Sequence, residues 1–361
     1  MRKFCLNTPI NSVSFGQVSF AIIREMLNRG IEPNLFTIGQ VDFNSQDLDE
    51  DLRSKITELL TYSLSRHDRE DSCFKLWHLN GALESPSQKQ ALLTFYELDD
   101  PTENEINAAK NNRTLFSSQH AIDVFKDKGV ECGYLPLFFD HHNFNKKDRK
   151  YFSDDRIVFN LCGKFEKRKH HARVLDAWSR KYGNDSRYFL QCAIYNPFLS
   201  PEENDGVIQN SLRGARYSNI QILKPMGKNS LYNDFLNSGN IVIGMSGGEG
   251  WGLPEFHSIG LGKHSVMLNA HSYKEFVDNE NSVLVEPSGK IDAYDGKFFI
   301  ENANFNQGQI YTWNEDDFID GCEEAVKRFE ASPVNEAGLK VREKFTLSRT
   351  VDSLINHLEA L

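Results

Sequence analysis

The sequence lacks several features that would place it in a special class. No run approaches the roughly 18 apolar residues that a membrane helix needs. The first residues, MRKFCLNTPINS, contain no apolar core of signal-peptide length. Six cysteines are scattered singly, without a CxxC or another zinc spacing, and several lie in apolar runs. We therefore expect buried free thiols, no metal site and a cytoplasmic location.

The chain also lacks an excess of positive charge. Its 41 Lys and Arg against 51 Asp and Glu give a net charge of −10. Binding to nucleic acid needs clustered cations, so the net charge disfavours a nucleic-acid partner. Short basic clusters at 145–150 and 164–173 keep such a partner possible. A length of 361 residues, 39% hydrophobic and 12% aromatic, suits two globular domains.

Short apolar runs alternate with polar, helix-like stretches along most of the chain. We expect strands at 2–7, 34–38, 74–79, 91–97, 114–118, 156–162, 187–194, 219–223, 240–245 and 264–269. We expect helices at 15–28, 48–64, 103–111, 121–128, 167–182, 230–236 and 254–261, and two or three more from 316 onward. This alternation predicts an α/β fold with parallel, doubly wound sheets.

A polar stretch, HHNFNKKDRKYFSDD, interrupts the alternation and predicts a linker. We expect one Rossmann-like domain at 1–145, the linker at 146–155 and a second Rossmann-like domain at 156–340. A C-terminal helix at 341–361 is expected to pack back on the first domain. Ligands bind open α/β sheets at the carboxyl ends of the strands, so a cleft between the two domains is the expected site.

The Gly-rich segment Ser246–Phe256 lies between an expected strand and an expected helix. Its glycines allow tight turns and close approach of a ligand to the backbone. Pro254 suits the first helical turn, where its missing N–H is not needed. The N-terminus of that helix offers N–H groups and partial positive charge to a diphosphate, and Glu249 could accept hydrogen bonds from sugar hydroxyls. A tight connection without a ligand is the alternative.

The order of these residues is more specific than their glycine content. SGGEGWGLPEF resembles the signature E-G-[FW]-G-L-P of retaining GT-B glycosyltransferases (family 4-like), and the likeness continues through SIGLGKHSVMLNAHSYKEFVDNENSVLVEP. The resemblance implies two Rossmann-like domains that face each other across a cleft, with the acceptor in the first and the donor in the second. It implies transfer of a hexosyl or similar group from a UDP- or GDP-sugar to an acceptor hydroxyl, with retention of configuration.

A second stretch, FNLCGKFEKRKHHARVLDAW, resembles the start of that family's donor domain, where Gly-[Arg/Lys] and then Lys follow a strand. Fixed cations there stabilise the departing nucleoside diphosphate, so no metal ion or other cofactor is expected. The expected catalytic residues are Glu249, Lys169 and Lys164, which the resemblance implies, and His78, which ends an expected strand. The implied donor-binding residues are Gly16, Gly163, Lys164, Arg168, Lys169, Met226, Gly227, Gly248, Glu249, Gly250, Trp251, Gly252, Leu253 and His257.

The family pattern breaks at one position. The family carries two glutamates with seven residues between them, and here the first is Glu249 but the second is His257. A neutral histidine accepts one hydrogen bond, so we expect His257 to face the nucleotide ribose, with a core or surface histidine as the alternative. Glu255 points about 200° away on a helix and is not expected to substitute.

Other titratable residues are less specific. His78 and Glu97 end expected strands, where each could contact the acceptor or the transferred sugar, or could be structural. The histidine pairs at 141–142 and 170–171 lack ligands at metal spacing, so we expect surface residues. Asp47–Asp49 matches a metal-binding Asp-x-Asp only trivially and is expected to begin a helix.

Two further interpretations stay open. The acceptor could be a modified DNA base, as for some phage glycosyltransferases, although the net charge counts against it. The protein could also bind a nucleotide sugar or glycan without transferring it. Glycan and glycolipid acceptors are both compatible with the sequence, although no strongly basic amphipathic helix supports a membrane surface.

Overall fold

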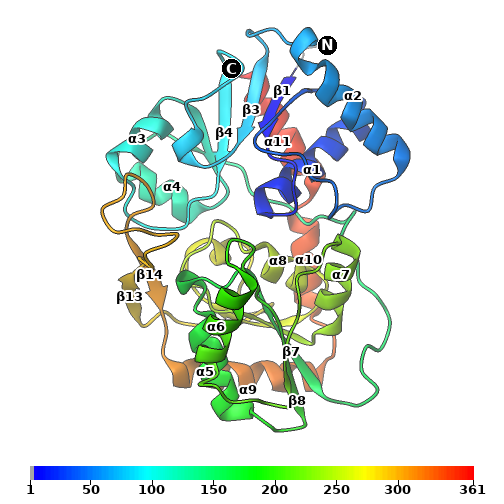
Figure 1. Ribbon diagram of the computed structural model, residues 1–361, viewed down its shortest axis with the longest axis vertical. Coiled ribbons are helices and arrows are strands. Elements are labelled where there is room, and N and C mark those ends of the chain that lie inside the picture. Colours follow the sequence, from blue (N-terminus) through cyan, green and yellow to red (C-terminus); the bar gives the residue numbers. More distant parts are fainter. Residues whose placement is uncertain (1–3) are drawn as a thin grey trace.

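Two six-stranded parallel sheets organise the chain in the computed structural model, which describes residues 4–361 (Figure 1). The first sheet has the order β2-β1-β3-β4-β5-β6. Its strands are β1 (Phe4–Thr8), β2 (Asn34–Thr37), β3 (Ser72–Leu76), β4 (Gln90–Thr94), β5 (Arg113–Phe116) and β6 (Gly133–Tyr134). Between them lie α1 (Ser14–Asn28), α2 (Glu50–Arg66), the 3-10 turn η1 (Leu79–Gly81), α3 (Glu103–Lys110) and α4 (Gln119–Lys126).

The second sheet has the order β12-β11-β10-β7-β8-β9. Its strands are β7 (Ile157–Cys162), β8 (Tyr188–Ala193), β9 (Ile220–Ile222), β10 (Ile241–Gly244), β11 (His264–Leu268) and β12 (Val283–Val285). Its helices are α5 (His171–Tyr182), α6 (Pro201–Ser211), α7 (Asn229–Ser238), α8 (Leu253–Gly260) and α9 (Glu315–Ala331), with 3-10 turns η2 (Lys167–Lys169) and η3 (His271–Glu275). Successive strands add outward from β7 in one direction and from β10 in the other. The boundary between these neighbours is therefore the topological switch point, where open α/β sheets bind ligands.

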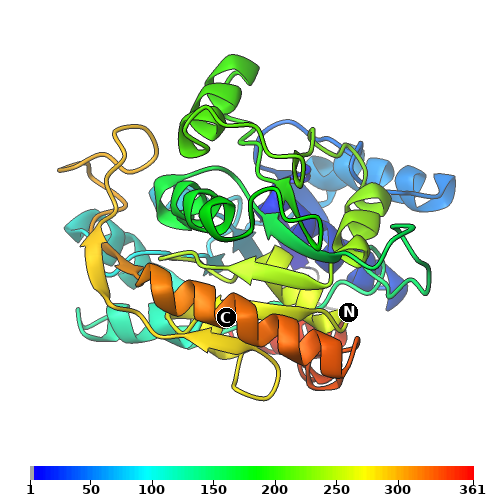
Figure 2. The ribbon, with the colours of Figure 1, turned by 90° about the horizontal axis from the view of Figure 1, so that it is seen from below.

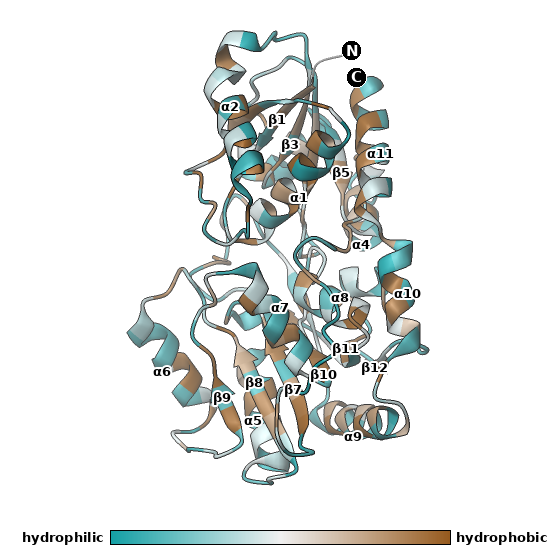
Figure 3. Cartoon of the chain, turned by 90° about the vertical axis from the view of Figure 1, so that its right-hand side faces the viewer, coloured by the Kyte–Doolittle hydropathy of each residue, from teal (hydrophilic) through white to brown (hydrophobic). Residues whose placement is uncertain are grey.

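Apolar strands fill the interior of both domains, and polar helix faces point outward (Figure 3). In α1 the apolar residues recur at helical spacing, so that Val18, Ile22 and Met26 are buried together. Helix α9 lies across the edge strands of the second sheet (Figure 2) and contacts β11 and β12. Within residues 4–361, no helix is both long enough and apolar enough to cross a bilayer.

The expected alternation of strands and helices is confirmed, with positions 2 and 3 of the first expected strand outside the described residues. As expected, Asp49 begins a helix, because its Oδ1 accepts a hydrogen bond from the Leu52 N–H at 2.8 Å. The helix expected at 167–182 is interrupted, since His170 has a left-handed φ of 54° between η2 and α5. Helix α6, with its Ser200 cap, was not expected from the sequence.

An arm at 286–312 connects the second domain to the first, and the sequence pattern did not predict it. Its hairpin pairs β13 (Gly289–Asp292) with β14 (Gln309–Thr312) and extends toward α3 and α4 (Figure 1). Phe299 and Ile310 of the arm share a hydrophobic core with Phe116 and Phe125 of the first domain. The Asn306 N–H also donates to Glu105 at 2.9 Å. Apolar packing thus holds the two domains together on this side.

The C-terminal segment crosses between the domains. Helix α10 (Glu336–Lys344) packs on α8, and α11 (Leu347–Glu359) packs on α1 and β3 of the first domain. The crossing lies between these two helices, where the Phe139 N–H donates to the Phe345 carbonyl at 2.8 Å. Residues 145–156, between the domains, contain no helix or strand.

Candidate active site

Two buried cations follow β7 at the switch point of the second sheet. Arg168 and Lys169 lie in η2 and expose only 4% and 7% of their surface. Gly163 ends the strand with φ 101°, and the Lys169 side chain lies against the position that a Cβ would take there. The sequence places these cations next to the start of α8, because the loop after β10 reaches the same edge of the sheet.

Glu249, from the loop after β10, pairs with both cations. Its Oε1 contacts Lys169 Nζ, and its Oε2 lies 3.1 Å from Arg168 Nη1. Burial alone would raise the pKa of the Glu249 carboxyl, but Arg168 and Lys169 outweigh burial and hold that pKa well below its usual value. Burial would lower the pKa of Lys169, and Glu249 reverses this effect. All three groups are therefore charged at neutral pH.

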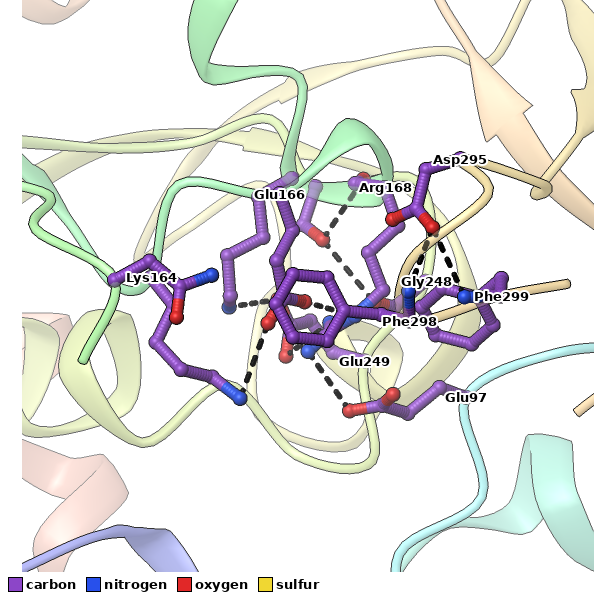
Figure 4. A network of polar contacts seen from close by, with 12 residues as sticks. Glu97, Lys164, Glu166, Arg168, Gly248, Glu249, Asp295, Phe298 and Phe299 are labelled. Carbon is purple, nitrogen blue, oxygen red and sulfur yellow. Dashed lines mark hydrogen bonds and ion pairs between the residues drawn. The ribbon is translucent and has the colours of Figure 1, made fainter. Parts of the chain in front are cut away.

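Arg168 links this pair to the first domain (Figure 4). Its Nη2 lies 2.9 Å from Oε1 of Glu97, which follows β4, and its Nε lies 2.9 Å from Oε2 of Glu166. Glu166 in turn contacts Lys164 Nζ at 3.1 Å. Three cations and three carboxylates thus form one continuous network, and the fold brings Lys164, Arg168, Lys169 and Glu249 together as the sequence predicted.

The Gly-rich loop is pressed against the first domain. The Gly247 N–H donates to the Arg168 carbonyl at 2.7 Å, and Ser117 Oγ donates to the Gly250 carbonyl at 2.6 Å. A Cβ on Gly248 or Gly250 would collide with the backbone or side chains of Glu97 and Phe95. Glycine at these two positions is therefore required for close contact between the domains, a reason that the sequence did not reveal.

The Trp251 side chain does not lie where a donor could contact it. Its side chain is 2% exposed and packs on Phe256, Phe276 and Phe345 at ring-centroid distances of 5.3–5.7 Å. This packing anchors the loop in the core and leaves only the Trp251 backbone for a ligand. The next residue, Gly252, has φ 94° and caps α8.

His257 also lies away from the cations. Its Nε2 accepts a hydrogen bond from the Asp140 N–H at 3.3 Å, and its ring packs on Phe144 at 4.2 Å. The backbone of Leu253 bonds to the same ring, and burial lowers the His257 pKa to about 4. The core alternative thus describes the surroundings of His257, whose hydrogen bonds join it to Asp140, ahead of the linker, and to the backbone of its own helix.

Glu255 lies where the sequence argument did not expect a site residue. It is grouped with Lys169, His171 and Ser246 beneath the Gly-rich loop. Burial raises the pKa of its carboxyl to about 7, although Lys169 opposes the shift. Positions 255 and 257 are about half a helical turn apart, so His257 faces Asp140 and Phe144 whereas Glu255 faces Lys169. The sequence shows that these two residues lie on different faces of the helix. It does not show which of those faces points to the cations.

The other expected residues lie at different depths around the network. His78 is exposed beyond β3, and the surrounding protein, with help from Lys164, lowers its pKa to about 4. Gly16 is buried in α1 against Asn11, so close packing rather than open space explains this glycine. Met226 and Gly227 lie between β9 and α7, where Met226 is half-buried and Gly227 exposed.

The surface expectation is correct for one histidine pair and wrong for the other. His141 and His142 are exposed, whereas His170 and His171 are buried and bond through Nε2 to the carbonyls of Tyr311 and Cys162. All six cysteines are free thiols, and five of them are buried. Among residues 4–361, no three His, Cys, Asp or Glu side chains are grouped to hold a metal ion.

No protein-family model matches the chain, and no curated protein matches its sequence. Solved structures do match its fold. The sucrose-phosphate synthase of Thermosynechococcus elongatus has a TM-score of 0.68 at 12% identity, over 100% of both chains. A glycosyltransferase from Rickettsia africae ESF-5 has a TM-score of 0.69 at 10% identity, over 99% of this chain and 98% of that one. Anabaena HepE, solved in complex with UDP and glucose, has a TM-score of 0.65 at 11% identity, over 100% of both chains.

These matches extend over both sheets and the connections between them, and they include the edges on which the charged network lies. At this identity they concern the fold and not the substrate. The chain has the GT-B fold of these glycosyltransferases, in which two Rossmann-like domains face each other along the carboxyl ends of their strands.

Proposed function

We propose that this protein is a glycosyltransferase that moves a sugar from a nucleotide-sugar donor to an acceptor hydroxyl. The observation that carries this proposal is the buried set of Arg168, Lys169 and Glu249 at the switch point of the second sheet. Burying charges away from water is costly, and replacing them by apolar side chains is often neutral or stabilising. A set of this kind at a ligand-binding edge is therefore better explained by function than by stability.

The diphosphate of the donor fits the cations and the start of α8. Backbone N–H groups at that helix terminus and the guanidinium and ammonium groups of Arg168 and Lys169 would hold its oxygens. The carboxylates that pair with these cations would compete with the diphosphate for them. In this proposal Glu249 turns toward the sugar hydroxyls when the diphosphate takes its place beside Arg168 and Lys169.

The reaction breaks the bond between the anomeric carbon and the diphosphate oxygen and forms a bond to the acceptor oxygen. The acceptor hydroxyl loses its proton, which the departing diphosphate takes up, so no side chain needs to act as a base. Arg168 and Lys169 stabilise the negative charge that develops on the leaving group. We propose retention of configuration, with the acceptor approaching on the leaving-group face, and no requirement for a metal ion or another cofactor.

The donor is proposed to be a UDP-sugar, with a GDP-sugar as the alternative. The complex of Anabaena HepE with UDP and glucose, on the same fold, supports this choice. Free thiols at all six cysteines fit a reducing compartment, and we propose the cytoplasm.

A thermal-shift screen tests the donor proposal. A ligand that binds only the folded state raises the midpoint of unfolding. We expect UDP and UDP-sugars to raise it for the wild-type protein and to have little effect on Lys169→Ala. That variant should remain folded, since Glu249 keeps its contact with Arg168. If no nucleoside diphosphate or nucleotide sugar shifts the wild-type midpoint, the proposal is wrong.

A further inference from the structure

The two facing sheet edges differ sharply in charge. The connections that follow β1 to β5 are residues 9–13, 38–49, 77–78, 95–102 and 117–118. These described segments contain no Lys or Arg. They do carry six carboxylates, Asp42, Asp47, Asp49, Glu97, Asp99 and Asp100. The connection after β7, in contrast, supplies Lys164, Lys167, Arg168 and Lys169.

Two cations that reach the first edge from elsewhere are already paired with its carboxylates. Lys290 of the arm lies 2.6 Å from Asp99, and Lys128 lies 3.0 Å from Asp100. Each of these contacts neutralises a carboxylate and leaves no spare positive charge beside it. The first edge, with six carboxylates and no Lys or Arg of its own, therefore offers poor surroundings to a phosphate group.

An aromatic cluster occupies the same edge of the first domain. Phe15 stacks on Phe95 with ring centroids 4.3 Å apart, and it lies 4.6 Å from the His78 ring and 5.8 Å from Trp77. Phe15 is buried, Trp77 and Phe95 are half-buried, and His78 is exposed. The buried Phe15 ring thus supports one exposed ring and two half-buried rings.

This cluster lies beside the proposed donor site. The Phe95 side chain is in close contact with Gly250 of the Gly-rich loop, and Glu97, two residues later, pairs with Arg168. The positive charge of Lys164, in the second domain, helps to lower the pKa of His78. A ring bound on the cluster would lie beside Glu97 and the Gly-rich loop of the proposed donor site.

We propose that the acceptor is an uncharged saccharide whose ring stacks on Trp77 and His78, rather than a sugar phosphate or a nucleic acid. This inference rests on the proposed glycosyltransferase function. The apolar C–H face of a sugar ring fits an aromatic surface, and a few polar groups then fix its orientation. Glu97 can accept hydrogen bonds from sugar hydroxyls. Burial raises the pKa of its carboxyl and Arg168 opposes this shift, and in the charged form that Arg168 favours the carboxylate would repel a phosphate ester.

The test measures nucleoside diphosphate release from a UDP-sugar, first without acceptor and then with matched acceptor pairs. The pairs are glucose with glucose 6-phosphate, mannose with mannose 6-phosphate, and fructose with fructose 6-phosphate, supplemented by maltose, lactose and methyl glucosides. We expect kcat/KM for at least one uncharged sugar to exceed that of the phosphate esters by about 10-fold or more. Nucleoside diphosphate release without any acceptor tests the donor site alone. If no release is seen in that assay, the proposed function is wrong, whereas the acceptor inference is tested by the assays with acceptor.

Substitutions at the cluster connect the preference to these residues. Trp77→Ala should raise the acceptor KM by about 10-fold, and Trp77→Phe should restore most of that loss because it keeps a flat ring. Tyr62→Ala removes an aromatic ring that is 48% exposed on α2, away from this edge, and should change nothing. The inference is overturned if a phosphate ester is the better acceptor, if donor is hydrolysed but no uncharged sugar accelerates release, or if duplex DNA is the acceptor.

Discussion

Arg168 and Glu97 form an ion pair between the two domains, with 2.9 Å between Nη2 and Oε1. The same guanidinium lies 3.1 Å from Glu249 and also contacts Glu166. Arg168 therefore joins the proposed donor site to the domain that carries the proposed acceptor site. Besides the Gly248 carbonyl, which accepts from Nη1 at 2.6 Å, the partners of Arg168 are these carboxylates, so a bound diphosphate has to compete with them for the guanidinium N–H groups.

Removing one of these competitors should strengthen nucleotide binding. We expect Glu97→Gln to lower the Kd for UDP by about 5-fold, because one negative charge near the diphosphate is lost. Isothermal titration calorimetry measures this effect directly. Asp100→Asn, which removes a charge from the exposed pair with Lys128, is the matched control and should leave the Kd unchanged. Weaker binding to Glu97→Gln would show that Glu97 does not compete with the donor.

Glu255 should make stability depend on pH. Burial raises its pKa from 4.5 to about 7 in the folded state, so the folded protein holds a proton that the unfolded chain releases. The contribution of protonated Glu255 to the free energy of unfolding is fully present below pH 4.5 and is lost as the pH rises toward and through 7. The loss is on the order of 3 kcal/mol. Urea unfolding of wild type and Glu255→Gln should show the wild type losing stability relative to the variant over this range. Parallel pH profiles would contradict the assignment.

His257→Ala separates a structural role from a donor-binding role. The buried ring packs on Phe144 and bonds to the Asp140 N–H, so its loss should cost about 2–4 kcal/mol of unfolding free energy. The Kd for UDP should change less than about 3-fold once only folded protein is counted. A loss of UDP affinity above 10-fold, without a matching loss of stability, would show instead that His257 contacts the nucleotide ribose.

The arm should matter for stability well beyond its own hairpin. Ile310 is fully buried in the core that the arm shares with the first domain, and its side chain also lies against Gly248. We expect Ile310→Ala to lower the unfolding free energy by about 2–5 kcal/mol. Ile300→Ala, at a position 53% exposed on the same arm, should cost less than about 0.5 kcal/mol. Equal effects of the two substitutions in urea unfolding would mean that the arm does not hold the domains together.

The sequence predicted the fold well where local patterns decide it. Apolar runs of strand length, such as the one that became β7, and helix starts, such as Asp49, need no tertiary information. The arm was missed because Phe299 and Ile310 are buried only by contact with a distant part of the chain. Such burial leaves no periodic pattern in a segment rich in Asn and Gly.

The candidate site was partly predictable for the same reason. The order of the two motifs predicted that Lys169 and Glu249 belong to one site, and the structure places their side chains in contact. It could not tell that Arg168 reaches across to Glu97, since that contact depends on how the domains meet. It also favoured His257 over Glu255, because a motif gives positions along a helix but not the rotation of that helix in its surroundings.

The most direct test of the central claim is the rate of nucleoside diphosphate release from UDP-sugars by wild type and Lys169→Ala. Both are assayed at equal concentrations of folded protein, with GDP-sugars alongside. The account predicts turnover by the wild type with at least one donor, and a loss of about 10²- to 10³-fold in kcat when the Lys169 cation is removed from the leaving group. Undiminished release by Lys169→Ala would contradict the account, as would the absence of release by the wild type with every donor.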